Sequence, residues 1–144
     1  MADNGRRIVV GIDGSPRSRE ALRWAVDQAR RTGAQVRAVA AWDVSPFVYL
    51  APTATEETYE QAAETVLNEV VESVLDEEDD VPIERVMVQG RPGPAVAKAA
   101  RGAELLVIGS HGHGEVPGMH LGSTAGYCVH HAPCPVLVIR HDDA

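Results

Sequence analysis

The feature that most constrains this fold is a series of five short apolar runs separated by segments of helical character. The runs lie at residues 7–12, 35–42, 83–88, 104–109 and 135–140. The first, fourth and fifth are nearly continuous in aliphatic residues, which predicts strands buried on both faces, whereas the second and third alternate and fit positions nearer a sheet edge. Strands that alternate with helices need right-handed crossovers, so the sequence predicts an α/β fold with three layers and five parallel strands.

Four helices are predicted from capping and terminating residues and from the spacing of apolar residues. Ser15 caps the first helix and Gly33 ends it. The second helix is marked by apolar residues at three- and four-residue steps over residues 59–75, with glutamates on its other side. The third covers about residues 92–102, and the fourth covers residues 123–131 before prolines end it.

Length and charge set limits on the function. A chain of 144 residues fits one domain, and we expect residues 1–144 to form a single one. The formal net charge of -8 disfavours binding to nucleic acid or to anionic lipid. No apolar run approaches the length of a membrane span, and residues 1–7 lack the apolar core of a signal peptide, so we expect a cytoplasmic protein.

The cysteines, histidines and acidic residues do not predict a metal site. Cys128 and Cys134 are six residues apart, which fits neither a C-x-x-C redox pair nor half of a zinc site, and both are interpreted as small buried side chains. The six histidines include no H-E-x-x-H pattern. The acidic run at residues 76–80 lacks the spaced ligands of a calcium loop and is interpreted as a solvated loop.

A ligand site is expected where the strands end, because open parallel sheets bind ligands beyond the carboxyl ends of their strands, at the point where the strand order reverses. The first run leads into Gly-Ile-Asp-Gly-Ser at residues 11–15. The fourth run leads into Gly-Ser-His-Gly-His-Gly at residues 109–114. If the first and fourth strands are neighbours, both loops face one crevice.

The second of these loops has the pattern G-x-x-G, nine residues, then G-S-T, from Gly109 to Thr124. Gly109 and Gly112 allow tight turns with exposed N–H groups, and Gly122 opens a helix. Unpaired N–H groups and the helix dipole favour an anion at such a helix start, and a polyphosphate is the natural ligand. A flexible surface loop with an N-cap serine is the structural alternative.

Motifs along most of the chain resemble, in order, the signatures of universal stress proteins. They are VVGIDGSP at residues 9–16, GRP at 90–92, GSHG and GS within 109–123, and HAPCPV at 131–136. The resemblance covers about residues 6–140 and implies a five-stranded parallel sheet with helices on both faces, doubly wound and Rossmann-like. It also places the chain in the branch whose G-x-x-G-x9-G-S/T loop binds ATP.

The resemblance implies particular binding residues. The glycine-rich loop would hold the phosphates and ribose, Ala41 would pack on the adenine, and Asp13 would lie beside the nucleoside unless it serves only as a turn or cap residue. The expected nucleotide-binding residues are Gly11, Ile12, Asp13, Ala41, Gly109, Ser110, His111, Gly112, Gly122, Ser123 and Thr124.

The loop departs from the family pattern in its charge. No Lys or Arg occurs from Gly109 to Gly126, and His111 and His113 stand where the family often has a basic residue. Since N–H groups alone balance a triphosphate incompletely, we expect a divalent ion such as Mg²⁺ to assist binding. Binding should also tighten below a pH of about 6.5, where histidines ordinarily become protonated.

The favoured function is that of an ATP-binding regulatory switch read by a protein partner whose identity the sequence does not reveal. The chain lacks the P-loop pattern and no nucleophile, base and acid converge, so we expect slow ATP hydrolysis at most, with His113 or Glu115 positioning a water. A non-binding interaction module of the same fold and a nucleotide-processing enzyme are the alternatives. The resemblance places residues 135–140 at the sheet edge, so we expect a homodimer through this apolar last strand, whose exposed edge needs cover.

Overall fold

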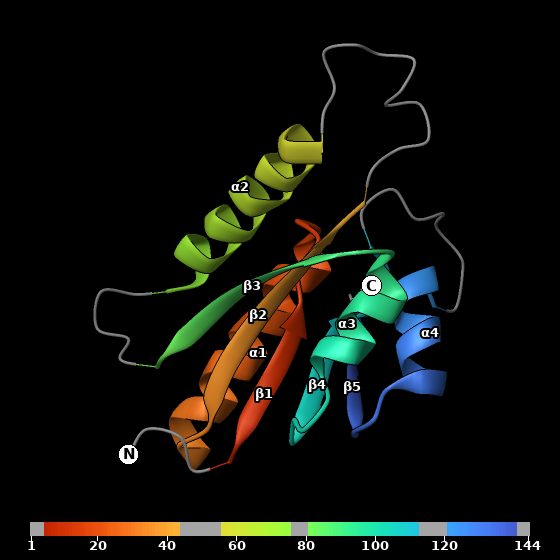
Figure 1. Ribbon diagram of the computed structural model, residues 1–144. Helices are drawn as coiled ribbons and strands as arrows, with labels where there is room; N and C mark the ends of the chain where they lie inside the picture. The colour runs from red at the N-terminus through yellow and green to blue at the C-terminus, as the bar shows by residue number, and fades with distance from the viewer. Residues whose placement is uncertain (1–4, 44–55, 76–80, 113–120, 141–144) are drawn as a thin grey trace.

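The computed structural model describes residues 5–43, 56–75, 81–112 and 121–140 (Figure 1). One parallel sheet has the strand order β3-β2-β1-β4-β5. Its strands are β1 (Arg7–Gly11), β2 (Gln35–Trp42), β3 (Ile83–Gln89), β4 (Leu105–Gly109) and β5 (Val136–Ile139). The helices are α1 (Pro16–Thr32), α2 (Glu56–Val74), α3 (Pro92–Ala99) and α4 (Ser123–His131). The strand order reverses between β1 and β4, which confirms the predicted doubly wound α/β fold.

Helices cover both faces of the sheet (Figure 1). α1 and α2 pack on one face, and α3 and α4 pack on the other. Successive residues of β1 point to opposite faces, so Ile8 and Val10 join the hydrophobic cluster under α1 and α2, while Val9 joins the cluster under α3 and α4. β1 is therefore buried on both sides, as its continuous apolar run predicted.

The two edge strands differ from the central strands in their exposure. β4 lies inside the sheet and three of its five residues are buried, as predicted. The same prediction is wrong for the last run, because β5 is an edge strand and all four of its residues are partly exposed. β5 has a neighbouring strand on one side only, so its apolar side chains lack the cover that β1 receives from strands on both sides.

The helix signals in the sequence are confirmed. Ser15 caps α1, and Gly33 ends it in the left-handed conformation with φ 79°. α4 has the predicted bounds. In α2 the buried residues Leu67, Val70 and Val71 belong to the predicted apolar stripe and lie in the second half of the helix.

Several sequence features lie outside the described residues. They are the segment at residues 44–55, the acidic run at residues 76–80, and residues 113–120 of the glycine-rich loop, which include His113, Glu115 and His120. Within the described ranges, no helix is both long enough and apolar enough to cross a membrane.

Candidate functional site

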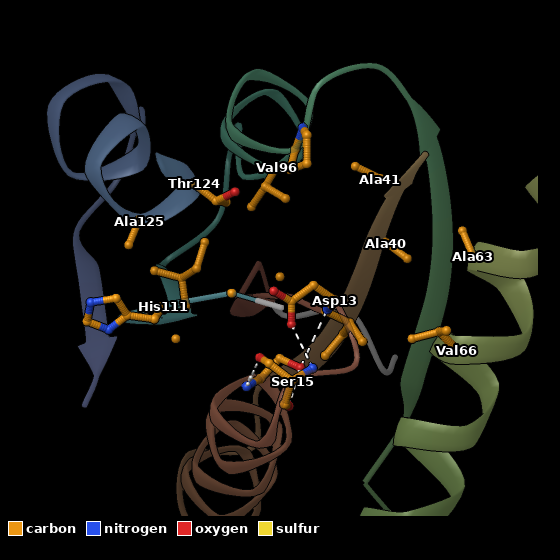
Figure 2. A pocket seen from close by; sticks show the side chains of 17 residues that line it. Asp13, Ser15, Ala40, Ala41, Ala63, Val66, Val96, His111, Thr124 and Ala125 are labelled. Carbon is orange, nitrogen blue, oxygen red and sulfur yellow. Dashed lines mark hydrogen bonds between the residues drawn. The ribbon is translucent and has the colours of Figure 1, made fainter. Parts of the chain in front are cut away.

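A cavity of about 180 Å³ opens beyond the carboxyl ends of β1, β2 and β4 (Figure 2). It lies between the loops that follow β1 and β4, which are neighbouring strands, so the predicted crevice is present. Eight of the predicted binding residues line it: Gly11, Ile12, Asp13, Ala41, Gly109, His111, Gly112 and Thr124.

Three predicted binding residues do not line the cavity: Ser110, Gly122 and Ser123. Ser110 is buried and connects the two ends of the glycine-rich loop. Its N–H donates to the carbonyl of Ile139 at 2.8 Å, and its own carbonyl accepts the N–H of Gly122 at 2.7 Å. Ser110 therefore holds the start of α4 next to the end of β4, and its Oγ lies 3.0 Å from Nδ1 of His111.

An apolar wall of the cavity was not predicted. Figure 2 shows Ala40, Ala41, Ala63 and Val66 together on one side of the cavity and Thr124 and Ala125 on the other, with Val96 between them. Ala63 and Val66 belong to the apolar stripe of α2, which indicated core packing and gave no sign of a ligand. Only the placement of α2 beside the end of β2 turns part of that stripe into a cavity wall.

The backbone of Ala41 faces the cavity. Polar backbone groups of alternate β2 residues point to the same neighbouring strand. The carbonyl of Val39 accepts the N–H of Ile12 on the β1 side, at 2.8 Å, and the carbonyl of Trp42 accepts the N–H of Gly90 on the β3 side, at 2.7 Å. Ala41 therefore directs its N–H and C=O to the β1 side, beyond the end of β1, where the cavity lies.

Asp13 serves the turn into α1 and also lies at the cavity. Its Oδ1 accepts the N–H of Ser15 at 2.9 Å, which confirms the turn interpretation. Ser15 Oγ then accepts the N–H of Ser18 at 3.2 Å, and the Ser18 hydroxyl donates to the Ser15 carbonyl at 2.9 Å. These contacts connect Asp13, Ser15 and Ser18, which all line the cavity. Figure 2 shows Asp13 and Ser15 next to each other at the start of α1.

The prediction that Gly109 allows a tight turn is wrong. Gly109 is the last residue of β4 and does not have a left-handed φ. A Cβ at this position would lie 2.8 Å from Cβ of Arg17 and 3.2 Å from its carbonyl carbon. The missing side chain therefore lets the first turn of α1 pack against the end of β4.

The start of α4 lies at the cavity, and Thr124 and Ala125 of its first turn line it. Gly122 is the N-cap residue, with φ -72° and ψ 173°, and as a glycine it has no side chain that could cap the helix. The backbone N–H groups and the dipole of a helix start make this wall attractive to an anion.

Charged side chains are few in the cavity. The lining residues that the structure describes include one carboxylate, Asp13, and one histidine, His111, with neither Lys nor Arg among them. Across the described ranges, no three His, Cys, Asp or Glu side chains come together in a way that suits a metal ion.

Cys128 belongs to α4 and Cys134 follows this helix, and both lie in the cluster under α3 and α4. Cys128 is fully buried, as predicted, whereas Cys134 is only partly buried. Burial, with a smaller effect from Cys134, raises the pKa of the Cys128 thiol to about 11. Burial also raises the pKa of Cys134. Both thiols are therefore poorly ionised near neutral pH.

Comparison with known proteins gives the same family along most of the chain. The universal stress protein family matches residues 5–140. A universal stress protein of Mycobacterium bovis is 40% identical over 133 residues, which are 92% of this chain and 45% of the relative. A universal stress protein of Methanocaldococcus jannaschii is 33% identical over 94% of this chain and 82% of the relative. The chain thus spans about half the length of the mycobacterial relative.

Solved structures of universal stress proteins have the same fold. UspA from Lactobacillus plantarum superposes with a TM-score of 0.78 at 25% identity, covering 94% of this chain and 97% of that one. A universal stress protein in complex with cAMP gives 0.71 at 23% identity, with 93% and 96% covered. A family member from Arabidopsis thaliana with AMP bound gives 0.65 at 18% identity, with 96% and 93% covered.

Proposed function

Since the chain belongs to the universal stress protein family, we propose that its cavity binds an adenine nucleotide, with ATP as the favoured ligand, and that the bound nucleotide acts as a regulatory switch. One observation carries the proposal: an apolar slot, the Ala41 backbone and the N-terminus of α4 meet in one cavity. The structural neighbours with cAMP and AMP bound support the choice of an adenine nucleotide.

The apolar side of the cavity suits the base. Small side chains of Ala40, Ala63 and Val66 leave room for a flat ring and exclude water from it. Adenine presents a donor beside an acceptor along its edge, and the N–H and C=O of Ala41 offer the complementary pair. Recognition by backbone groups also explains why no polar side chain is needed on this wall.

The opposite side suits the phosphates. Thr124 and Ala125 of the first turn of α4 line the cavity, and the bond between Ser110 and Gly122 holds this helix start beside the end of β4. Phosphate groups bind readily at such helix starts. Mg²⁺ would be held mainly by the phosphates and water, as is usual for this ion, with Asp13 as the carboxylate within the cavity.

The protein would act by binding rather than by catalysis. Nucleotide occupancy would change the surface around the cavity, and a regulatory protein partner would recognise the changed surface. The partly exposed edge of β5 favours a homodimer through this strand as part of the same proposal. Slow ATP hydrolysis, a cytoplasmic location and a single domain stay predictions.

The proposal is tested first by mass spectrometry of small molecules released from freshly purified protein, followed by calorimetric titration with ATP, with and without Mg²⁺. Gly122→Val should abolish binding because a branched side chain at the N-cap would hinder the approach of an anion to the start of α4, and the fold should persist because valine readily adopts the φ and ψ of Gly122. Gly126→Ala is the matched control, since a Cβ there meets no atom within 4 Å.

The outcomes are distinct. Release or binding of an adenine nucleotide, lost only in Gly122→Val, supports the proposal. Wild-type protein that neither releases nor binds an adenine nucleotide would favour the alternative of a non-binding interaction module. A single-turnover assay with brisk ATP hydrolysis would contradict the switch and indicate an enzyme.

A further inference from the structure

Arg17 lies directly against the glycine-rich loop, although the loop itself contains no Lys or Arg. It occupies the second position of α1, and its Cβ lies 2.8 Å from where a Cβ on Gly109 would be. Ser15 and Ser18, in the same helical turn, line the cavity. Arg17 is therefore a cationic residue whose backbone contacts the first glycine of the loop from the α1 side.

The Nε atom of Arg17 is buried and has no hydrogen-bond partner among the described residues. A buried donor of a charged group is unfavourable when it lacks an acceptor, and such groups are rare in folded proteins. An anionic ligand beside Gly109 would supply acceptor atoms on this side of the loop.

The electrostatics of the cavity require a cation from outside its lining. Asp13 contributes a negative charge, and the dipole of α4 contributes only a partial positive one. A triphosphate carries several negative charges, which these groups leave unbalanced. Arg17, next to Gly109, is placed to add a full positive charge that does not depend on pH.

We propose that Arg17 is a phosphate-binding residue that makes charge-assisted hydrogen bonds to the terminal phosphates and so sets the preference for ATP over AMP and adenosine. The inference rests on the proposed function, because it assumes an adenine nucleotide in the cavity. It adds a positively charged residue from α1 to a cavity whose described lining contains neither Lys nor Arg. The guanidinium group suits this role because its planar donors match phosphate oxygens.

The competing explanation is packing. The aliphatic stem of Arg17 covers Gly109, and its charged head could simply stay in water, as is common for arginine. Packing alone would affect adenosine and ATP alike, because both need the same fold. A phosphate contact would affect only the ligands that carry terminal phosphates, so selectivity separates the two explanations.

The test is calorimetric titration of adenosine, AMP and ATP, without divalent ions, into the wild type and the variants Arg17→Gln, Arg17→Lys and Arg19→Gln. Arg19→Gln is the matched control, because Arg19 also has a buried Nε without a described partner but lies about 200° further around α1. We expect Arg17→Gln to weaken ATP binding by about tenfold to a hundredfold, the range for a hydrogen bond between charged groups. The adenosine affinity of Arg17→Gln should equal that of the wild type. Arg17→Lys should lose less ATP affinity than Arg17→Gln, and Arg19→Gln should bind ATP as tightly as the wild type.

Two results would overturn the inference while leaving the proposed function in place. One is an equal loss of adenosine and ATP affinity in Arg17→Gln, which shows a structural role. The other is ATP affinity unchanged in Arg17→Gln, which shows that the charge does not reach the phosphates. If the wild type binds none of the three ligands, the proposed function itself fails and the inference about Arg17 fails with it.

Discussion

Two helix starts meet at the cavity, and they satisfy their backbone N–H groups in different ways. At the start of α1, Asp13 accepts the N–H of Ser15, and Ser15 in turn caps the N–H of Ser18. At the start of α4, the N-cap residue is Gly122, which has no side chain to provide a cap. One helix start is completed by the side chain of its N-cap residue, and the other has an N-cap residue that cannot do this.

The difference indicates that one helix start stabilises the fold and the other can bind a ligand. A capped helix start stabilises the fold, since an N-cap serine contributes about 1 kcal/mol. An uncapped start gives up that contribution and keeps donors available to an anion. The cavity thus combines a wall fixed by the protein with a wall that a ligand would complete.

The strongest test is to give α4 a cap of its own. In Gly122→Asp, the new carboxylate would accept the first N–H groups of α4 and would repel phosphates. We expect ATP affinity to fall by about a hundredfold or more, because a like charge placed in a binding site costs several kcal/mol. Thermal unfolding should occur at an equal or slightly higher temperature, since aspartate caps helices a little better than glycine.

Gly122→Asn is the matched control for charge in this experiment, because it caps the helix without a carboxylate. Its ATP affinity should lie between those of the wild type and Gly122→Asp. Full ATP affinity in Gly122→Asp would show that the start of α4 is not the phosphate site.

A smaller effect is expected where α1 packs on β4. Gly109→Ala places a Cβ 2.8 Å from Cβ of Arg17, so the first turn of α1 must shift. Overpacking of this kind destabilises proteins by about 1–3 kcal/mol, which urea unfolding would measure. Gly126→Ala should stabilise α4 by about 0.5–1 kcal/mol, because a Cβ there meets no described atom within 4 Å and alanine favours the helix over glycine. Equal stability of the two variants would contradict the close contact between α1 and β4.

Removing the cap of α1 should have a still smaller effect. Ser15→Ala loses the bond to the N–H of Ser18 and should lower the free energy of unfolding by about 1 kcal/mol. Ser123→Ala, one residue after the N-cap of α4, removes no N-cap side chain and should change it by less than about 0.5 kcal/mol because Ser123 is exposed. Urea unfolding of both variants measures these changes. A larger loss of unfolding free energy in Ser123→Ala than in Ser15→Ala would contradict the prediction.

The smallest effect concerns the far side of α4 and appears only at high pH. The pKa of Cys128 is raised from 9.0 to about 11, so the folded state holds the thiol proton more tightly than the unfolded state. The contribution is complete below pH 9 and is lost as the pH rises toward 11. We expect the free energy of unfolding to fall between pH 9 and pH 11, and to fall less in Cys128→Ala. The same pH dependence in both proteins would assign the loss to other groups.

Much of the fold could be predicted from the sequence because its signals are local. The continuous apolar run of β1 indicates burial on both faces, and Ser15 and Gly33 mark the ends of α1. The glycine-rich pattern likewise placed Gly122 at the start of α4. Each of these features depends on the residue itself or on its near neighbours, so the order of side chains is sufficient to predict it.

The tertiary structure decided the features that depend on residues far apart in the chain. Gly109 has no side chain because Arg17, from another element, packs against it, and Ala63 and Val66 became a cavity wall only when α2 was placed beside β2. The exposure of β5 likewise follows from its place at the sheet edge, since its own residues are as apolar as those of a central strand. Burial and close contact depend on which elements become neighbours, and that is set by the packing of the whole sheet.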